Sequence, residues 1–212
     1  TGMVVAAGLA AGWLWCGQLP MDWTPLEETG TAETENIRQE LAGLGFPESV
    51  LADLSEEDLE DCRGALMVVW DQDDYPVNDG REVVTREGNT TVYSTVYDVK
   101  ELRVTGVAVK LPGERERWKV FHHFQWVADP GWWGTEAIQL WPAWHSEMGW
   151  SRDQAVTGRI LCERDGRTWT APYAFLGPVT YTSNDFFSGT QDRTDIFASF
   201  SLPRDGENAR GY

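Results

Sequence analysis

The chain of 212 residues carries 34 acidic and 17 basic side chains, which gives a formal net charge of −17, and 42% of its residues are hydrophobic. This length suits one domain, or one domain with a small appendage, and the apolar content excludes a disordered polyelectrolyte. A charged fraction of 24% argues against a multi-span membrane protein. Because phosphate contacts need clustered lysine and arginine, the acidic balance also argues against a nucleic-acid partner.

Residues 1–21 carry no charged side chain, and the first charge belongs to Asp22. The continuously apolar part, residues 3–16, is shorter than the ~20 residues that a spanning helix needs. Thr1 is not an initiator methionine, so we expect an excerpt whose upstream residues complete the membrane segment. Residues 1–21 are then an apolar membrane-exit segment with an aromatic belt of Trp13, Trp15 and Trp23. The alternative is a buried core helix.

Residues 22–63 form an acidic segment in which the carboxylates face only two basic side chains, those of Arg38 and Arg63. The cytoplasmic flank of a membrane helix usually carries extra lysine and arginine, so their scarcity favours the extracytoplasmic side. An acidic, solvated helical face is the alternative explanation and is compatible with the same location. We therefore expect a membrane-anchored, extracytoplasmic protein.

The acidic segment nevertheless has the pattern of ordered helix. Thr31 is a suitable N-cap, and acidic residues follow it near the positive end of the helix dipole. Ile37, Leu41 and Leu44 recur at helical spacing and form one apolar stripe. Gly45 can end this helix in the left-handed conformation.

Two further short helices are expected before residue 63. Pro47 can open the first of them, and Ser55 with Asp58 three residues later has the pattern of a capping box for the second. The run Leu44-Gly45-Phe46-Pro47 followed by two short helices resembles the ubiquitin-associated three-helix domain. The resemblance covers this short segment alone, and an extracytoplasmic location leaves no role for ubiquitin. We therefore interpret residues 22–63 as an acidic linker and helical pedestal.

From residue 64 onward the period changes from helical to alternating, which is typical of strands. The apolar run 65–70 should end in a polar turn over residues 71–76. The clearest hairpin joins 160–164 to 167–171 through Asp165-Gly166, the residues that a tight type I′ turn requires. Further strands are expected at 82–86, 90–99, 102–111, 118–127, 179–182 and 196–202. We predict a mainly β fold, an antiparallel β-sandwich or barrel-like domain over residues 64–212.

Three cysteines, Cys16, Cys62 and Cys162, allow at most one internal disulfide. In an exported domain Cys62 with Cys162 is the one pair that leaves out the membrane-proximal Cys16, but sequence alone cannot establish the short separation that a disulfide needs. Buried thiols that remain free and act as small hydrophobic groups are the preferred interpretation.

Two groups of side chains could ligate a metal ion. Residues 71–79 hold five oxygen-bearing side chains that would suit calcium, but their spacing differs from that of an EF-hand, and a solvated turn is preferred. His122 and His123 are adjacent on an expected strand, so they face opposite sides and make a poor pair for zinc. His145 and Glu147 lack further ligands at a suitable spacing. We therefore expect no metal site and no cofactor.

Signs of catalysis are weak in this sequence. No Gly-x-Ser-x-Gly motif and no phosphate-binding glycine-rich loop occurs, and neither Cys62 nor Cys162 stands in a catalytic context. Glu136 and Glu147 could form the carboxylate pair of a glycoside hydrolase, although so acidic a chain offers many such pairs by chance. An enzyme is therefore the less favoured interpretation.

Tryptophan is concentrated between residues 126 and 150, and neighbouring glycines and prolines favour strand ends and loops for several of these side chains. Core packing is the preferred explanation, because β-domains often bury indoles. Exposed indoles, by contrast, bind sugars, peptides or partner proteins. The candidate ligand-binding residues are Trp132, Trp133, Trp141, Trp144 and Trp150.

These patterns together predict a membrane-tethered, extracytoplasmic module for binding, sensing or interaction, with a protein or carbohydrate ligand. The alternative is a carbohydrate-binding β-sandwich module that uses the loop tryptophans, and a glycoside hydrolase comes third. Exposed, coplanar indoles would favour a sugar ligand, whereas a closed cleft with paired carboxylates would favour an enzyme. A flat surface with neither feature would favour the interaction module.

Overall fold

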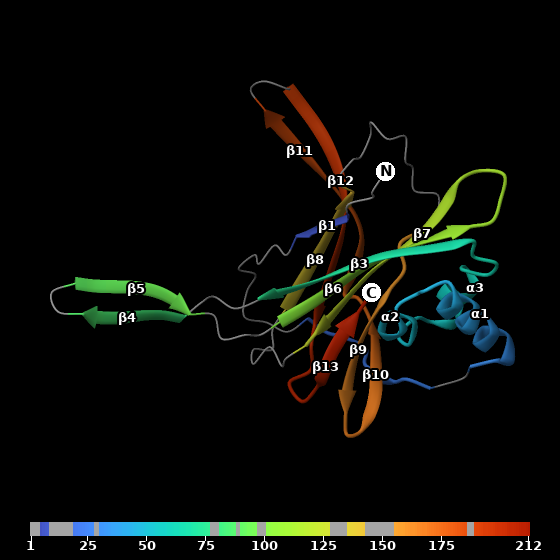
Figure 1. Cartoon of the computed structure of the whole chain (residues 1–212), viewed down its shortest axis with the longest axis horizontal. Coiled ribbons are helices and arrows are strands. Elements are labelled where there is room, and N and C mark those ends of the chain that lie inside the picture. The colour runs from blue at the N-terminus through green and yellow to red at the C-terminus, as the bar shows by residue number, and fades with distance from the viewer. Residues whose placement is uncertain are drawn as a thin grey trace.

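The structure is a computed structural model that describes residues 5–8, 19–27, 30–76, 81–87, 90–96, 101–127, 135–142, 155–185 and 189–212. In these ranges the chain is mainly β, and its ladders are antiparallel. The prediction of mainly antiparallel β structure is therefore confirmed. Figure 1 shows the helices gathered at one end of the molecule and a two-stranded hairpin projecting at the other.

The described elements are three short helices and thirteen strands. The helices are α1 (Ala32–Gly43), α2 (Glu48–Leu51) and α3 (Glu56–Glu60). The strands are β1 (Val5–Gly8), β2 (Thr24–Pro25), β3 (Met67–Pro76), β4 (Arg81–Glu87), β5 (Thr90–Val96), β6 (Glu101–Leu111), β7 (Arg117–Trp126), β8 (Thr135–Pro142), β9 (Arg159–Arg164), β10 (Arg167–Pro172), β11 (Phe175–Asp185), β12 (Gly189–Ser201) and β13 (Glu207–Gly211).

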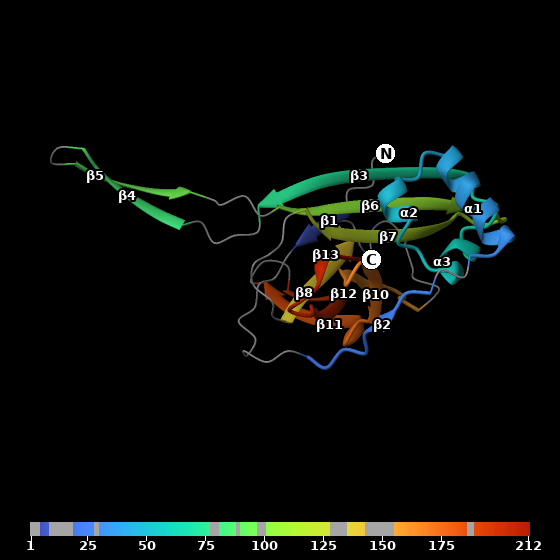
Figure 2. The ribbon, with the colours of Figure 1, turned by 90° about the horizontal axis from the view of Figure 1, so that it is seen from below.

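The strands form three sheets. A seven-stranded sheet has the order β2-β10-β9-β13-β7-β6-β3, a four-stranded sheet has the order β1-β8-β12-β11, and β4 and β5 pair only with each other among the described strands. Figure 2 shows β3, β6 and β7 in one layer and β8 and β12 in a second layer beside it. The strand β3 lies at the border of the large sheet.

The two larger sheets share a hydrophobic core. Leu102 on β6, Phe124 on β7 and Ile160 on β9 pack against Phe200 near the end of β12 and Leu202 just after it. The rings of Phe124 and Phe200 are stacked with their centroids 5.3 Å apart. Burial of these side chains holds the sheets together, because each fully buried large apolar side chain contributes roughly 1.5–3 kcal/mol.

The helices cover the opposite face of the large sheet. Ile37, Leu41 and Leu59 of the helical segment form one buried cluster with Val109 on β6 and Phe121 on β7. Side chains alternate along a strand, so β6 and β7 send one set of residues toward the helices and the other toward the small sheet. The helical segment therefore shares a core with the strands.

Local sequence signals explain how the first helix begins and ends. The side chain of Thr31 accepts a hydrogen bond from the backbone N–H of Thr34, and the backbone N–H of Thr31 donates one to the hydroxyl of Thr34. Gly45 has φ +88°, as its predicted left-handed role requires. Leu44, expected on the apolar stripe, is instead the C-cap residue of α1, and 38% of its surface is exposed. The helix ends at this position, so the side chain of Leu44 does not continue the buried stripe. Pro47 is the N-cap of α2 and not its first residue.

The β9–β10 hairpin has the predicted geometry. Asp165 and Gly166 have φ of +51° and +70°, which places both turn residues in the left-handed region. The predicted strand at 179–182 is part of the longer β11, and that at 196–202 is part of β12. The strands β8 and β13 were not expected from the pattern.

The predicted polar turn over residues 71–76 is wrong. The backbone stays extended, and β3 pairs with β6 from Met67 opposite Lys110 to Pro76 opposite Glu101. A border strand keeps its side chains near water, so acidic residues are tolerated there, and a proline can stand at its end. Alternation of apolar and polar residues is therefore a poor guide to where this strand stops.

The start of the chain is described in part. Val5–Gly8 form β1, which pairs with β8 at the border of the small sheet. Residues 3–4 and 9–16, the rest of the predicted apolar segment, lie outside the described residues. In the described part of the chain, the helices are too short or too polar to cross a membrane.

Candidate functional site

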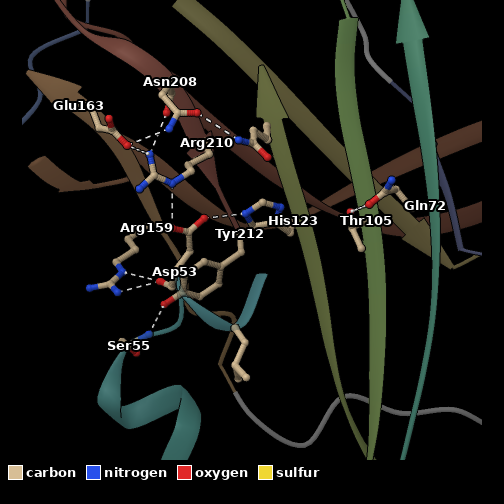
Figure 3. Close-up of polar contacts among 12 residues, drawn as sticks. Asp53, Ser55, Gln72, Thr105, His123, Arg159, Glu163, Asn208, Arg210 and Tyr212 are labelled. Carbon is tan, nitrogen blue, oxygen red and sulfur yellow. Dashed lines mark hydrogen bonds and ion pairs between the residues drawn. The ribbon is translucent and has the colours of Figure 1, made fainter. Parts of the chain in front are cut away.

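Asp53, in the turn after α2, is buried against the large sheet with 3% of its surface exposed. Its Oδ2 lies 2.8 Å from Nε2 of His123 on β7, and its Oδ1 accepts a 2.8 Å hydrogen bond from Nε of Arg210 on β13. Arg159 on β9 donates to the backbone carbonyl of Asp53 at 2.7 Å. Figure 3 shows the three side chains converging on this turn. The turn between α2 and α3 is thus tied to three adjacent strands.

From Arg210 the polar contacts continue to the surface. Its Nη1 lies 3.3 Å from Oε1 of Glu163, and the amide of Asn208 donates to the same oxygen at 2.8 Å. Gln125 in turn donates to Asn208 at 3.1 Å. The side chain of Glu163 is 46% exposed, whereas that of Asp53 is 5% exposed, so the network joins a buried charge to a solvated one.

A second carboxylate, that of Asp58 in α3, forms a parallel link. It accepts hydrogen bonds from Nζ of Lys119 on β7 at 2.9 Å, from the hydroxyl of Tyr212 at 2.8 Å and from the hydroxyl of Ser55 at 2.6 Å. Ser55 is the N-cap of α3 and accepts from the backbone of Asp58, which is one half of the predicted capping box. The other half is not formed, because the backbone N–H of Ser55 donates to the hydroxyl of Tyr212. The hydroxyl of Ser55 therefore caps the helix, and the carboxylate of Asp58 ties the capped end to the sheet through Lys119 and Tyr212. We call the contacts of Asp53 and Asp58 the ionic junction.

The two carboxylates of the ionic junction have lowered pKa values. Burial would raise the pKa of Asp53, but the hydrogen bond from His123 and the charge of Arg210 outweigh it and hold that pKa below its ordinary value. For Asp58, burial is again outweighed, here by hydrogen bonds from Ser55, Lys119 and Tyr212, and its pKa is also lowered. Both carboxylates are therefore ionised at neutral pH and held by groups on the strands.

The ionic junction contains residue types found in catalytic sites, but its geometry is structural. A general base must reach a proton on a substrate, and His123 is 1% exposed. Among the described residues, Nδ1 of His123 has no hydrogen-bond partner, so no described nucleophile is positioned on it. The junction fixes the helical segment to the sheet.

Acid should weaken the ionic junction. Because Asp53 and Asp58 have folded-state pKa values below their unfolded values, they stabilise the fold fully above the unfolded pKa of roughly 4, and this stabilisation is lost as the pH falls through the lowered values. We expect the free energy of unfolding, measured in urea, to fall steeply below about pH 4. The slope should be shallower in Asp58→Asn, and a free energy that is unchanged between pH 5 and 2 would contradict this assignment.

The two cysteines in the described part of the chain are free and buried, as preferred from the sequence. Cys62 packs in the cluster under the helices, and Cys162 lies on β9. Burial raises the pKa of Cys62 to about 12 and that of Cys162 to about 11, so neither is a nucleophilic thiolate at neutral pH. Cys16 lies outside the described residues.

The histidines face opposite sides of β7, as predicted. His123 points to Asp53 under the helices, whereas the adjacent His122 belongs to the alternate set of side chains on β7. Burial lowers the pKa of His122 to about 4, so its ring is neutral at neutral pH. In the described residues, no group of three or more histidine, cysteine or acidic side chains is placed to hold a metal ion.

A second feature is the outer edge of β3, which lies at the border of the large sheet as the structure describes it. Ten residues of β3 pair with β6 on one side, and no described strand pairs with the other side. Alternate backbone N–H and C=O groups of a border strand point away from its sheet. Figure 2 shows β3 along the border of its layer.

Large hydrophobic side chains are exposed along this edge. In the described part of the chain, exposed side chains of this type gather on and just before β3: Leu66 (59%), Met67 (42%), Val69 (43%), Trp70 (52%) and Tyr75 (39%). A group of exposed apolar side chains on a border strand is typical of a contact site. We call residues 66–75 the β3 edge.

The tryptophans predicted to bind a ligand are mostly beyond what the structure describes. Trp132, Trp133, Trp144 and Trp150 lie outside the described residues, and for Trp141 only its backbone position, paired with Ala6 at the end of β8, is described. Their role as a binding platform stays a prediction. The exposed Trp70 on β3 was not among the predicted site residues, although the run Val68-Val69-Trp70 before four polar residues could have marked a solvent-exposed strand.

The predicted carboxylate pair and the predicted calcium cluster are each described only in part. Glu136 lies on β8, and burial raises the pKa of its carboxyl group. Its proposed partner Glu147, like His145, is outside the described residues. In the proposed calcium cluster, Asp71, Asp73 and Asp74 stand on a strand, and Asp74 is bound by Arg103 at 2.8 Å. The extended backbone separates these three residues from the turn that was expected to hold them, and Asn78 and Asp79, the other two residues of the cluster, lie outside the described residues.

Comparisons with protein-family models, with curated proteins and with solved structures find no match. Two features of the chain bear on function: the ionic junction and the β3 edge. Of these two, the ionic junction is enclosed by the helices and the large sheet. The β3 edge exposes large hydrophobic side chains on a strand whose second side has no partner among the described strands.

Proposed function

We propose that this antiparallel, sandwich-like domain is an interaction module that binds an extended polypeptide segment along the β3 edge. The observation that carries the proposal is the exposure of Val69 and Trp70 on a strand whose outer edge has no described partner. Strand addition uses the free main-chain groups for affinity and alternate side chains for specificity. An exposed tryptophan supplies the large contact area typical of such interfaces.

The two edge strands of the large sheet, β2 and β3, differ in a way that supports this proposal. The edge strand β2 has only two residues, Thr24 and Pro25, and proline offers no N–H to an added strand. Short edge strands and prolines protect sheets against unwanted pairing. The other edge strand, β3, has ten residues, and its single proline, Pro76, is the last of them. An added strand is therefore hindered at β2 and accommodated at β3.

The location of the module is a second part of the proposal. The uncharged residues 1–21 and the acidic flank that follows support a membrane-tethered, extracytoplasmic protein. The whole chain should then co-sediment with lipid vesicles, whereas a chain that lacks residues 1–18 should stay in the supernatant. Equal distribution of the two chains would count against the tether.

The alternative functions rest on other residues. Carbohydrate binding depends on the loop tryptophans, and a glycoside hydrolase depends on a carboxylate partner for Glu136. No described contact favours either of these functions over strand binding at the β3 edge. Both remain predictions from the sequence.

Binding along the β3 edge can be tested with a fluorescein-labelled octapeptide of alternating serine and valine. We expect the fluorescence anisotropy of this peptide to rise on titration with the protein, because its extended backbone pairs with β3. Trp70→Ser should weaken binding at least about tenfold, since truncation of a central aromatic side chain at an interface commonly costs 2 kcal/mol or more.

A matched control is Phe175→Ser, which removes a similarly exposed aromatic side chain (46%) from β11 on the other sheet. Both substitutions are at the surface, so the free energy of unfolding should change by only about 0.5 kcal/mol. Equal affinity in wild-type protein, Trp70→Ser and Phe175→Ser, or no binding at all, would refute the proposal.

A further inference from the structure

The side chains of β3 divide into two rows. Met67, Val69, Asp71 and Asp73 stand opposite Lys110, Ala108, Gly106 and Val104 of β6, so they share the face that β6 turns toward the small sheet. The other row, which includes Trp70 and Gln72, faces the helices. Figure 3 shows Gln72 of this row directed at Thr105 of β6. The first row thus runs from apolar to acidic along the strand.

Among the described side chains, no cation pairs with the acidic half of this row. Asp71 and Asp73 are exposed, and neither is paired with a lysine or arginine in the ranges that the structure describes. Asp71 accepts a hydrogen bond only from the backbone of Gln72, and Asp73 only from the hydroxyl of Tyr75 at 3.3 Å, among the described contacts. The neighbouring Asp74, by contrast, is bound through both oxygens by Arg103 at 2.8 and 2.9 Å.

We infer that the segment bound at the β3 edge carries two basic side chains two positions apart, followed by two apolar side chains at the same spacing. This inference rests on the proposed function. Residues directly opposite in a ladder lie about 4.5–5.5 Å apart, and opposite charges at such positions attract whereas like charges repel. Basic side chains opposite Asp73 and Asp71 would neutralise both carboxylates, and apolar ones opposite Val69 and Met67 would cover the exposed hydrophobic groups.

The direction of the segment follows from the sheet. The ladders of the large sheet are antiparallel, and antiparallel pairing is slightly the more stable arrangement. In an antiparallel addition the amino-terminal half of the segment lies opposite the second half of β3. The basic residues therefore precede the apolar ones.

A second copy of this chain is the weaker occupant. Each copy carries a formal charge of −17, so two copies repel each other over their whole surfaces. A basic segment gains from the same field, which also draws it to the protein before contact. Charge thus favours a cationic partner over self-association.

The test uses the full chain and four fluorescein-labelled octapeptides, measured by anisotropy at low and high salt. The first is Thr-Lys-Thr-Lys-Thr-Val-Thr-Val, and two others replace both lysines by serine or by glutamate. The fourth has the first sequence in reverse order. At low salt we expect the lysine peptide to bind about tenfold more tightly than the serine peptide, and the glutamate peptide to bind most weakly. The difference should shrink in high salt, because exposed charges are screened.

Two double variants separate the local charge from the net charge. Asp71→Asn with Asp73→Asn should remove the preference for lysine and leave the affinity for the serine peptide unchanged. Glu114→Gln with Glu207→Gln removes two other exposed carboxylates and should keep the preference. Loss of the preference in both double variants would show an effect of net charge, which would overturn the assignment to Asp71 and Asp73.

The remaining outcomes are also decisive. Equal affinity for the lysine, serine and glutamate peptides would overturn the inference of a basic segment and leave strand binding in place. Equal or tighter binding of the reversed peptide would overturn the inferred direction. Absence of binding for every peptide would refute both the inference and the proposed function. Concentration-dependent dimers that Val69→Lys abolishes, seen by sedimentation, would assign the β3 edge to a second copy.

Discussion

Replacement of Asp53 by alanine should lower the free energy of unfolding by about 3–5 kcal/mol, because removal of one partner from a buried ion pair deprives the other of its buried counter-charge. In Asp53→Ala, the guanidinium of Arg210 loses its 2.8 Å contact in a site where only 13% of its side chain is exposed. His123, which is 1% exposed, loses its hydrogen bond at the same time. Urea unfolding followed by circular dichroism measures the change.

A control removes an ion pair of similar chemistry at the surface. Glu33 lies 2.7 Å from Arg63, but its side chain is 66% exposed, so Glu33→Ala should cost at most about 1 kcal/mol. A double-mutant cycle adds a second check, since Arg210→Ala should cost less in the Asp53→Ala background than in the wild-type protein. Additive effects, or a cost of Asp53→Ala as small as that of Glu33→Ala, would contradict the role of the ionic junction.

Replacement of Phe200 by alanine should have an effect of similar size, about 3–5 kcal/mol, because truncation of a buried aromatic side chain leaves a cavity. Phe200 is 1% exposed on β12 and stacks on Phe124 of the large sheet, with ring centroids 5.3 Å apart. Tyr173 contacts it edge to face at 5.8 Å. Thermal and urea unfolding of Phe200→Ala would measure the contribution of this contact between the sheets.

The control for Phe200 is another phenylalanine of the same sheet. Phe175 on β11 is 46% exposed, so Phe175→Ala should change the free energy of unfolding by about 0.5 kcal/mol or less. Similar losses in the two variants would mean that the sheets do not share a core at Phe200.

Elements with local signals were predictable from the sequence. Thr31 and Gly45 delimit α1 through contacts with residues three or four positions away, and Asp165-Gly166 sets the β9–β10 turn by its own backbone preference. The opposite directions of His122 and His123 follow from the geometry of one strand. Each of these features depends on a few consecutive residues.

Features that depend on distant residues were not predictable. Asp53 and His123 are 70 positions apart, and nothing near either residue identifies its partner. The second half of β3 has polar residues that favour a turn, yet pairing with β6 keeps it extended, with Asp74 held by Arg103. Tertiary contacts override local preference at such positions, as is common for strands.

The ionic junction and the β3 edge have complementary roles in the proposed function. Val107 on β6 and Phe121 on β7 belong to the cluster that packs under the helices, and β6 is the strand that pairs with β3. The ionic junction and this cluster hold the helices on one face of the large sheet, and β3 stays at its border. A rigid border strand lowers the entropy cost of adding another strand.

Hydrogen–deuterium exchange of the β3 amides, with and without the lysine octapeptide, tests the central claim most directly. In the unbound protein the outward N–H groups of residues 67–75 have no backbone partner among the described residues and should exchange rapidly. If the peptide adds to the sheet, exchange in β3 should slow on binding while exchange in β10 and β13 stays the same. Slower exchange elsewhere with no change in β3 would show that the peptide binds at another site.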